Sequence, residues 1–171
     1  PIPRDPSEVV VRDERIRLRA NQVIIWLSMA TRLSQGLSPA ARAFPAIVDT
    51  DHTHTLSIQQ RQLFEWAGLR PDALPVIGAA REQGRRVTLR AARIWVRPTA
   101  RGFRDRLADR PAFRLAASEG IAVYPLELEF PRLPILGLRA IVDNRLVLVV
   151  NGHRREATLR TAFRWWPLAG R

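Results

Sequence analysis

The sequence predicts a mostly β fold with one or two short helices. Apolar or alternating runs of about four to eight residues recur along the chain, and proline, glycine or asparagine separate them. Only one segment carries a helix pattern with its own start and stop signals, and that segment is short. At 171 residues, with 46% hydrophobic and 26% charged residues, the chain has the composition of one globular domain with a substantial core.

Strand patterns fill the first part of the chain. Residues 9–11 are three consecutive valines, residues 16–19 alternate apolar and basic side chains, and residues 23–27 form a continuous apolar run. β-branched and aromatic residues in such patterns favour strands, and an unbroken apolar run favours a buried one. Residues 31–45 contain Gly36 and two prolines, so we expect a connection there before a further buried strand at residues 46–48.

A short helix is expected from about residue 58 to residue 67. Ser57 followed by Gln60 matches a capping box, in which the hydroxyl and the amide satisfy free N–H groups of the first turn. Gly68 stands where a helix commonly ends in a left-handed residue.

The remaining strands flank a long irregular segment. Residues 98–120 are rich in arginine and broken by proline and glycine, so we expect a mobile excursion rather than a tight hairpin. A short helix is expected after Gly137, and Asn151-Gly152 predicts a hairpin between residues 146–150 and 156–159. Alternating or apolar patterns predict further strands at residues 86–90, 94–96, 121–124 and 126–130.

One domain is expected over residues 9–160, with a flexible proline-rich arm at residues 1–8 and a tail at residues 161–171. The chain has no cysteine, which excludes disulfides, thiol nucleophiles and cysteine-ligated metals. No apolar run reaches the roughly 18 residues that span a bilayer, and no secretory signal is visible. We therefore expect a cytoplasmic protein without a membrane partner.

The net charge of +12 makes nucleic acid an alternative partner. Every basic residue apart from histidine is an arginine, and the arginines are spread along the chain rather than gathered in one tail or helix. Arginines at positions 81, 85, 86, 90 and 93 fit a phosphate-binding row, but a solvated strand face explains them more simply. Trp26, Trp66, Trp95 and the pair Trp165-Trp166 fit base-stacking platforms, but core or dimer packing is favoured for them.

The chemistry is concentrated where a buried strand ends in acidic and hydroxyl side chains. Asp49, Thr50 and Asp51 directly follow the apolar residues Ile47 and Val48. Taken alone, Asp49-Thr50 also fits a simple turn, because both side chains bond to nearby backbone. A second apolar segment far downstream, residues 134–141 with Gly137 at its centre, precedes the last predicted strands.

Together the two segments resemble the retropepsin-like aspartic peptidases, the single-lobe family that includes retroviral proteases. In that family a strand ends in Asp-Thr/Ser-Gly, and a later apolar-apolar-Gly segment crosses behind it and leads into a short helix and a final strand. Ile47-Val48-Asp49-Thr50 matches the first segment and Ile135-Leu136-Gly137 the second. The resemblance implies a closed acid-protease-like barrel with a flap hairpin, drawn from about residues 86–123.

The resemblance also implies an aspartic endopeptidase that works as a homodimer on a peptide or protein substrate, without a cofactor. Asp49 from each chain would be the catalytic residue, and Thr50, Asp51 and Gly137 would support the active-site loop. Asp51 replaces the family's glycine. If its side chain points inward, like-charge repulsion would disfavour ionisation of the catalytic pair; if it points outward, little changes. A catalytically inactive domain of the same fold, which binds peptides or partners, remains an alternative.

A metal site is a further alternative at the same segment. Asp49, Asp51, His52 and His54 are metal-ligand types, and His-x-His would place both imidazoles on one face of a strand. Catalytic zinc usually needs three protein ligands, however, and the remaining histidine, His153, falls in the predicted hairpin turn. We therefore expect no metal here and favour polar histidines on an exposed loop or strand face.

Overall fold

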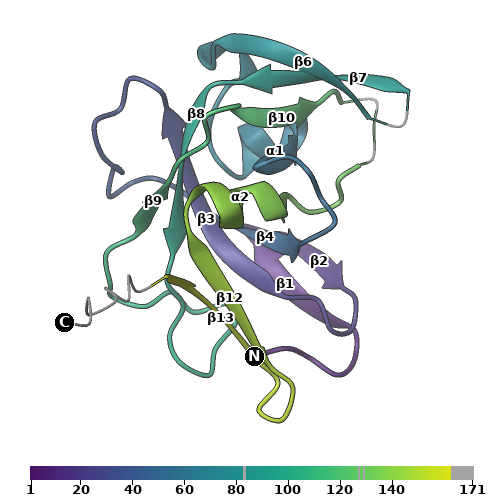
Figure 1. Cartoon of the computed structure of the whole chain (residues 1–171), viewed down its shortest axis with the longest axis vertical. Coiled ribbons are helices and arrows are strands. Elements are labelled where there is room, and N and C mark those ends of the chain that lie inside the picture. Colours follow the sequence, from purple (N-terminus) through teal and green to yellow (C-terminus); the bar gives the residue numbers. More distant parts are fainter. Residues whose placement is uncertain (83, 127, 129, 163–171) are drawn as a thin grey trace, which may run out of the picture.

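The computed structural model describes residues 1–162 except 83, 127 and 129. This part of the chain is mostly β, as predicted, with two short α-helices (Figure 1). Most of the expected tail at residues 161–171, including Trp165-Trp166, lies outside the described residues; Thr161 belongs to the last strand. No helix in the described part is long and apolar enough to cross a membrane.

The helices and strands of the described residues have the following bounds. The helices are α1 (Gln60–Glu65), the 3-10 turn η1 (Pro71–Ala73) and α2 (Leu138–Asp143). The strands are β1 (Ser7–Val11), β2 (Glu14–Leu18), β3 (Ile24–Thr31), β4 (Ala43–Asp49), β5 (Leu56–Gln59), β6 (Val76–Glu82), β7 (Arg85–Arg90), β8 (Ala92–Arg97), β9 (Phe113–Leu115), β10 (Ile121–Tyr124), β11 (Ile135–Gly137), β12 (Leu146–Asn151) and β13 (Glu156–Thr161).

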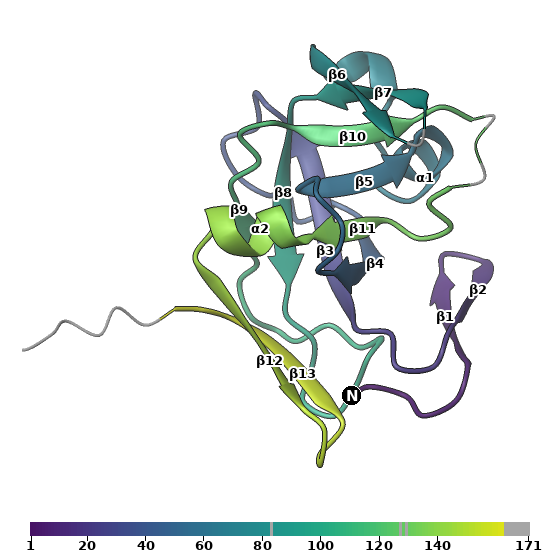
Figure 2. The same ribbon diagram turned by 45° about the vertical axis from the view of Figure 1, so that its right-hand side comes forward.

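Nine strands form one sheet in the order β6-β7-β10-β5-β11-β4-β3-β8-β9, while β1–β2 and β12–β13 are separate two-stranded hairpins. Figures 1 and 2 show β6–β7 at one end of the molecule and the two separate hairpins toward the other. The expected closed barrel is not confirmed. β9 has three residues and pairs only with β8, so within the described chain no ladder joins it to the opposite edge strand, β6.

The centre of the sheet is built by β11, which lies between β4 and β5. Those two strands are consecutive along the chain, yet each hydrogen-bonds to β11 from much later in the sequence. β11 runs parallel to β4, with Gly137 opposite Asp49, and antiparallel to β5, with Leu136 opposite Leu56. The two segments expected from the sequence to meet are therefore neighbours in the sheet.

The core is packed around these same strands. Phe44, Leu56, Ile58 and Leu136 have no exposed surface. Burying each such side chain contributes about 1.5–3 kcal/mol relative to leaving it in water. The positions of Asp49 and Gly137 are thus fixed by apolar residues on their own strands.

The first helix starts later than expected. β5 continues through Gln59, which pairs with Tyr124 of β10, so Ser57 is a buried strand residue and not a helix cap. The capping box is formed instead by Gln59 and Gln62. Gly68 has φ of +71°, which confirms the expected left-handed residue after the helix.

The hairpin expected within residues 86–123 begins about ten residues earlier. β6 pairs antiparallel with β7 to give a hairpin over residues 76–90. The sequence did not predict β6, because its mostly exposed residues show no clear alternation of apolar and polar side chains. Residues 98–120 are largely irregular, apart from β9 and a bridge between Thr99 and Leu107.

Two further predictions have different outcomes. The strand expected at residues 126–130 is wrong for the described residues 126, 128 and 130, while Glu127 and Glu129 lie outside them. The final hairpin is confirmed as β12–β13, and its loop spans residues 152–155 because β12 extends by one residue to Asn151. Residues 2 and 3, in the arm expected to be flexible, hydrogen-bond to Arg155 in that loop.

Gly137 is the residue that this packing constrains most sharply. A Cβ added there would overlap the carbonyl oxygens of His52 and His54. Gly137→Ala is therefore expected to lower the free energy of unfolding by about 1–3 kcal/mol, the usual cost of overpacking. Urea denaturation measures the change. Gly36→Ala is the matched control, because nothing lies within 4 Å of its added Cβ; an equal loss in both variants would contradict the prediction.

Candidate functional site

Asp49 stands at the end of β4, half-buried, where the chain turns into the loop of residues 50–55 that leads to β5. The Asp51 backbone N–H donates to Asp49 Oδ1 over 3.0 Å, and the His52 N–H donates to the Asp49 carbonyl over 3.3 Å. These bonds form a side-chain-stabilised turn of the kind Asp favours. They fix the orientation of the Asp49 carboxylate relative to the loop of residues 50–55.

The loop is also tied to the junction of β11 and α2. Leu138 N–H donates to the His52 carbonyl over 3.0 Å, and Gly137 N–H donates to the Thr55 carbonyl over 3.3 Å. These bonds require the loop backbone to lie against Gly137. The absence of a side chain at Gly137 also lets the carbonyls of His52 and His54 approach its backbone.

Asp51, which replaces the glycine of the family motif, does not strain this turn. Among the described non-glycine residues, positive φ occurs only at Arg12, Asn21, Arg145 and Arg155. The Asp51 residue is exposed and does not line the cleft that contains Asp49. Thr50 is exposed beside it. In this single chain Asp51 therefore adds no second carboxylate to the cleft.

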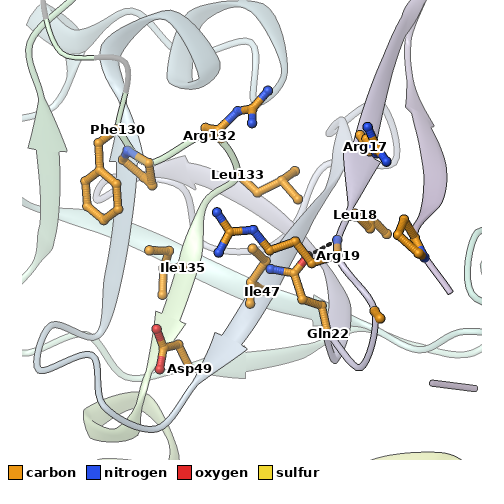
Figure 3. Close-up of a pocket in the computed structure, with 13 residues that line it drawn as sticks. Arg17, Leu18, Arg19, Gln22, Ile47, Asp49, Phe130, Arg132, Leu133 and Ile135 are labelled. Carbon is orange, nitrogen blue, oxygen red and sulfur yellow. Dashed lines mark hydrogen bonds between the residues drawn. The ribbon is translucent and has the colours of Figure 1, made fainter. Parts of the chain in front are cut away.

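A cleft of about 530 Å³ opens beside Asp49 (Figure 3). One wall comes from the end of β2 and the loop after it, the other from the segment before β11, and the end of β4 and the start of β11 lie between them. The described residues that line it, among which Asp49 is the only carboxylate, are Pro6, Arg17, Leu18, Arg19, Ala20, Gln22, Ile47, Asp49, Phe130, Pro131, Arg132, Leu133 and Ile135.

The wall before β11 is held by a glutamine of α1. Gln62 is 4% exposed, and its Nε2 donates to the carbonyls of Pro131 and Arg132 over 2.8 and 3.0 Å. Its Oε1 accepts from the Gln59 N–H over 3.0 Å, so both ends of the amide are used. Because buried amides are costly to leave unpaired, these hydrogen bonds fix the wall relative to α1.

The two histidines of the loop point to different partners. His52 Nε2 lies 2.6 Å from Ser57 Oγ, and His54 Nε2 lies 2.9 Å from Glu82 Oε1 at the end of β6. Both histidines belong to the loop, not to a strand face. In the described part of the chain no group of three or more potential ligands is arranged to hold a metal ion, so the metal alternative gains no support.

The nucleic-acid alternative also loses its aromatic platforms among the described residues. Trp26, Trp66 and Trp95 are at most 7% exposed, which leaves no face for a stacked base. Arg90, one of the arginines considered for phosphate contact, donates instead to the carbonyls of Pro71 and Leu74.

Of the residues predicted from the sequence, Asp49, Thr50, Asp51 and Gly137, only Asp49 is among the described residues that line the cleft, and the other residues that shape it were missed. Gln62 gave only a weak signal, as part of a glutamine-rich helix start. The arginines of the cleft were hidden by the even spread of arginine along the chain. Glu82 was missed with β6, where Gly84 at the hairpin turn was the one available signal.

Comparisons with known proteins add no family to this picture. No protein-family model, no curated protein and no solved structure matches the chain. The evidence for a function therefore consists of the strand arrangement around Asp49 and the chemistry of the cleft.

His52 is expected to make stability depend on pH. Burial lowers the pKa of His52 below its ordinary value of 6.5; His54 acts in the same direction, while Glu82 and Asp49 oppose it. The folded chain thus binds this proton more weakly than the unfolded chain. The resulting stability is complete above pH 6.5, declines as the pH falls below that value, and is lost below the folded-state pKa.

Urea denaturation between pH 7.5 and about pH 4.5 tests this dependence. His52→Gln cannot titrate, so its stability should fall less steeply toward acid than that of the wild-type chain. His153→Gln, at an exposed loop position, should leave the slope unchanged. Equal slopes in the wild type and His52→Gln would show that His52 is not responsible.

Glu82 is expected to anchor the β6–β7 hairpin to the loop of residues 50–55. The side chains of His54 and Glu82 are only 16% and 23% exposed, so their contact is better shielded from water than the other ion pairs described. Glu82→Ala should speed amide hydrogen exchange in β6–β7 by up to about fivefold. Glu8→Ala, which removes the exposed pair with Arg15, should have no effect there. Unchanged exchange in Glu82→Ala would refute the anchoring role.

Proposed function

We propose that this protein is a retropepsin-like aspartic endopeptidase that acts as a homodimer, with Asp49 of each chain forming the catalytic pair. The observation that carries the proposal is the central pairing of the sheet. β11 runs between β4 and β5 and sets Gly137 opposite Asp49, which opens onto the cleft. This is the relation between the two motif segments that the family resemblance implies.

Peptide hydrolysis at this site requires two carboxylates in different protonation states. Two such groups about 3 Å apart share one proton, because both cannot ionise at that distance. The ionised Asp49 accepts a proton from a water molecule as it attacks the peptide carbonyl carbon, and the protonated Asp49 donates to the carbonyl oxygen. Among the described residues that line the cleft, Asp49 is the only carboxylate, and in this proposal the second comes from the partner chain.

Exposed side chains near the loop support a second copy at this place. Thr50 is exposed next to Asp49, where its hydroxyl is available to the partner's loop. Leu138 and Val142 lie four residues apart on α2 and are 44% and 63% exposed. Since Leu138 hydrogen-bonds to His52 in the loop of residues 50–55, this apolar face of α2 adjoins Asp49. A symmetric dimer would cover it.

In this proposal the β6–β7 hairpin is the flap, so the flap spans residues 76–90. The nine-stranded sheet takes the place of the family's barrel, and His54 links the flap to the loop through Glu82. Closure of the hairpin over a bound peptide would exclude water from the reacting carbonyl. The outward position of Asp51 favours an active enzyme over the inactive binding domain.

Asp49→Asn is expected to abolish peptide hydrolysis, with a loss in kcat/KM of at least about 100-fold, because the amide can neither share nor transfer the proton. Asp51→Asn is the matched control and should keep most of the activity. A fluorogenic peptide library assayed from pH 3 to pH 7, with and without pepstatin, measures both. Activity should peak at acidic pH and be blocked by pepstatin.

Dilution tests the dimer in the same assay. Specific activity should fall as the chain is diluted through its dimerisation constant, which sedimentation measures independently. Hydrolysis that persists in Asp49→Asn would rule out the aspartic mechanism. A wild-type dimer that binds peptides without cleaving any of them would identify the inactive binding domain instead. Nucleic-acid binding that weakens steeply with salt and is unchanged in Asp49→Asn would identify the nucleic-acid-binding module.

A further inference from the structure

The cleft beside Asp49 is strongly cationic. Arg17 and Arg19 come from the β2 side and Arg132 from the opposite wall, and within the described part of the lining Asp49 is the only carboxylate. Among the described residues, none of the three guanidinium groups forms an ion pair with a carboxylate. All three residues are exposed. The charge of the cleft is therefore available to a ligand.

Arg19 is the best placed of the three. Its backbone N–H donates to Gln22 Oε1 over 2.7 Å, which fixes the turn that follows β2. Figure 3 shows the Arg19 side chain reaching from this turn toward the middle of the residues that line the cleft, with the Asp49 carboxylate beyond it. A guanidinium in that position can bind a carboxylate through two parallel N–H groups.

Between these cations the cleft is apolar. Ile47 is partly exposed, and Leu133 and Ile135 keep a small exposed area, so these three offer an aliphatic surface between the two walls, with Leu18 fully buried behind it. A ligand that fits must combine an apolar segment with at least one negative charge. A peptide with an acidic residue close to apolar ones has that combination.

We infer that the Asp49 cleft selects peptides that carry an aspartate or glutamate beside apolar residues, with Arg19 as the main specificity-determining residue and Arg17 and Arg132 as secondary ones. For cleavage the inference rests on the proposed function; for binding it does not. In a symmetric dimer each subunit brings its own three guanidinium groups, so acidic residues are favoured on both sides of the cleaved bond.

An acidic peptide fits this cleft better than a nucleic acid does. The lining contains one aromatic residue, Phe130, whereas single-stranded nucleic acid is bound on several aromatic platforms. The aliphatic surface suits side chains rather than bases.

The cleavage experiment uses pairs of peptides that differ only by glutamate or glutamine within an apolar sequence. At an ionic strength of about 20 mM the wild-type chain should cleave the glutamate peptide roughly two- to tenfold more efficiently, and added salt should reduce the ratio. Arg19→Gln should bring the ratio toward one. Arg19→Glu should turn the preference toward lysine peptides.

Arg15→Gln is the matched control. Arg15 lies two residues before Arg17 on β2, is exposed like Arg17 and Arg19 and carries the same charge, but it is not among the described residues that line the cleft. Its removal should leave the glutamate preference unchanged. Cleavage of the glutamine peptide reports that each variant is folded, and Arg132→Gln provides a second test from the opposite wall.

Binding to the Asp49→Asn chain separates recognition from catalysis. Fluorescence anisotropy with labelled glutamate, glutamine and lysine peptides should give the same order of affinity and the same loss in a chain that also carries Arg19→Gln. Equal affinity for the glutamate and glutamine peptides would overturn the inference, even if Asp49-dependent cleavage is found. Absence of any cleavage by the wild type would refute the proposed function and leave the binding result to decide the inference. Tighter, Arg19-dependent binding of a single-stranded oligonucleotide would assign the cleft to nucleic acid and overturn the inference as well.

Discussion

The structure depends on the placement of β11 between β4 and β5. Its hydrogen bonds join two strands that are consecutive in the chain but not paired with each other, and its last residue, Gly137, lies opposite Asp49. The loop between β4 and β5 must then pass around the end of β11, with the carbonyls of His52 and His54 packed where a side chain would otherwise be. The position of Asp49, the shape of the loop and the start of α2 are all consequences of this one insertion. Because the three strands are filled with buried aliphatic side chains, the stability of the core and the geometry of the site have the same origin.

The charges around the cleft connect the two proposals. The described residues of the cleft supply one carboxylate, which is too few for the proposed acid–base chemistry, and three guanidinium groups, which are more than that carboxylate neutralises. A second subunit supplies the missing acid and at the same time doubles the cations. Pairing of the chains would therefore create the catalytic centre and the preference for acidic peptides in a single step, and a separated chain would have neither in full.

The sequence predicted the parts of the site that depend on local patterns. Residues 46–48 and 134–136 are apolar runs, so their burial was predictable, and the family resemblance joined Asp49 to Gly137. Pairing between strands far apart in the chain was not predictable, because it depends on which buried surfaces fit together. β6 was missed since its residues are mostly exposed and carry no clear period. The capping box moved from Ser57 to Gln59 because pairing with β10 extended β5 by two residues. The cationic cleft had no local pattern at all, since its arginines meet only in the folded chain.

The β1–β2 hairpin, which supplies one wall of the cleft, is hydrogen-bonded as a sheet of its own. Substitutions at the exposed positions of β2 therefore do not disturb the ladder that holds β4, β11 and β5 together. The opposite wall is different, because hydrogen bonds from Gln62 hold it to α1. During evolution the two walls are thus under unequal constraint. If the proposed peptide binding is correct, substitutions on the β2 side would change the ligand preference, while the wall next to α1 and the strand that bears Asp49 would have to stay as they are.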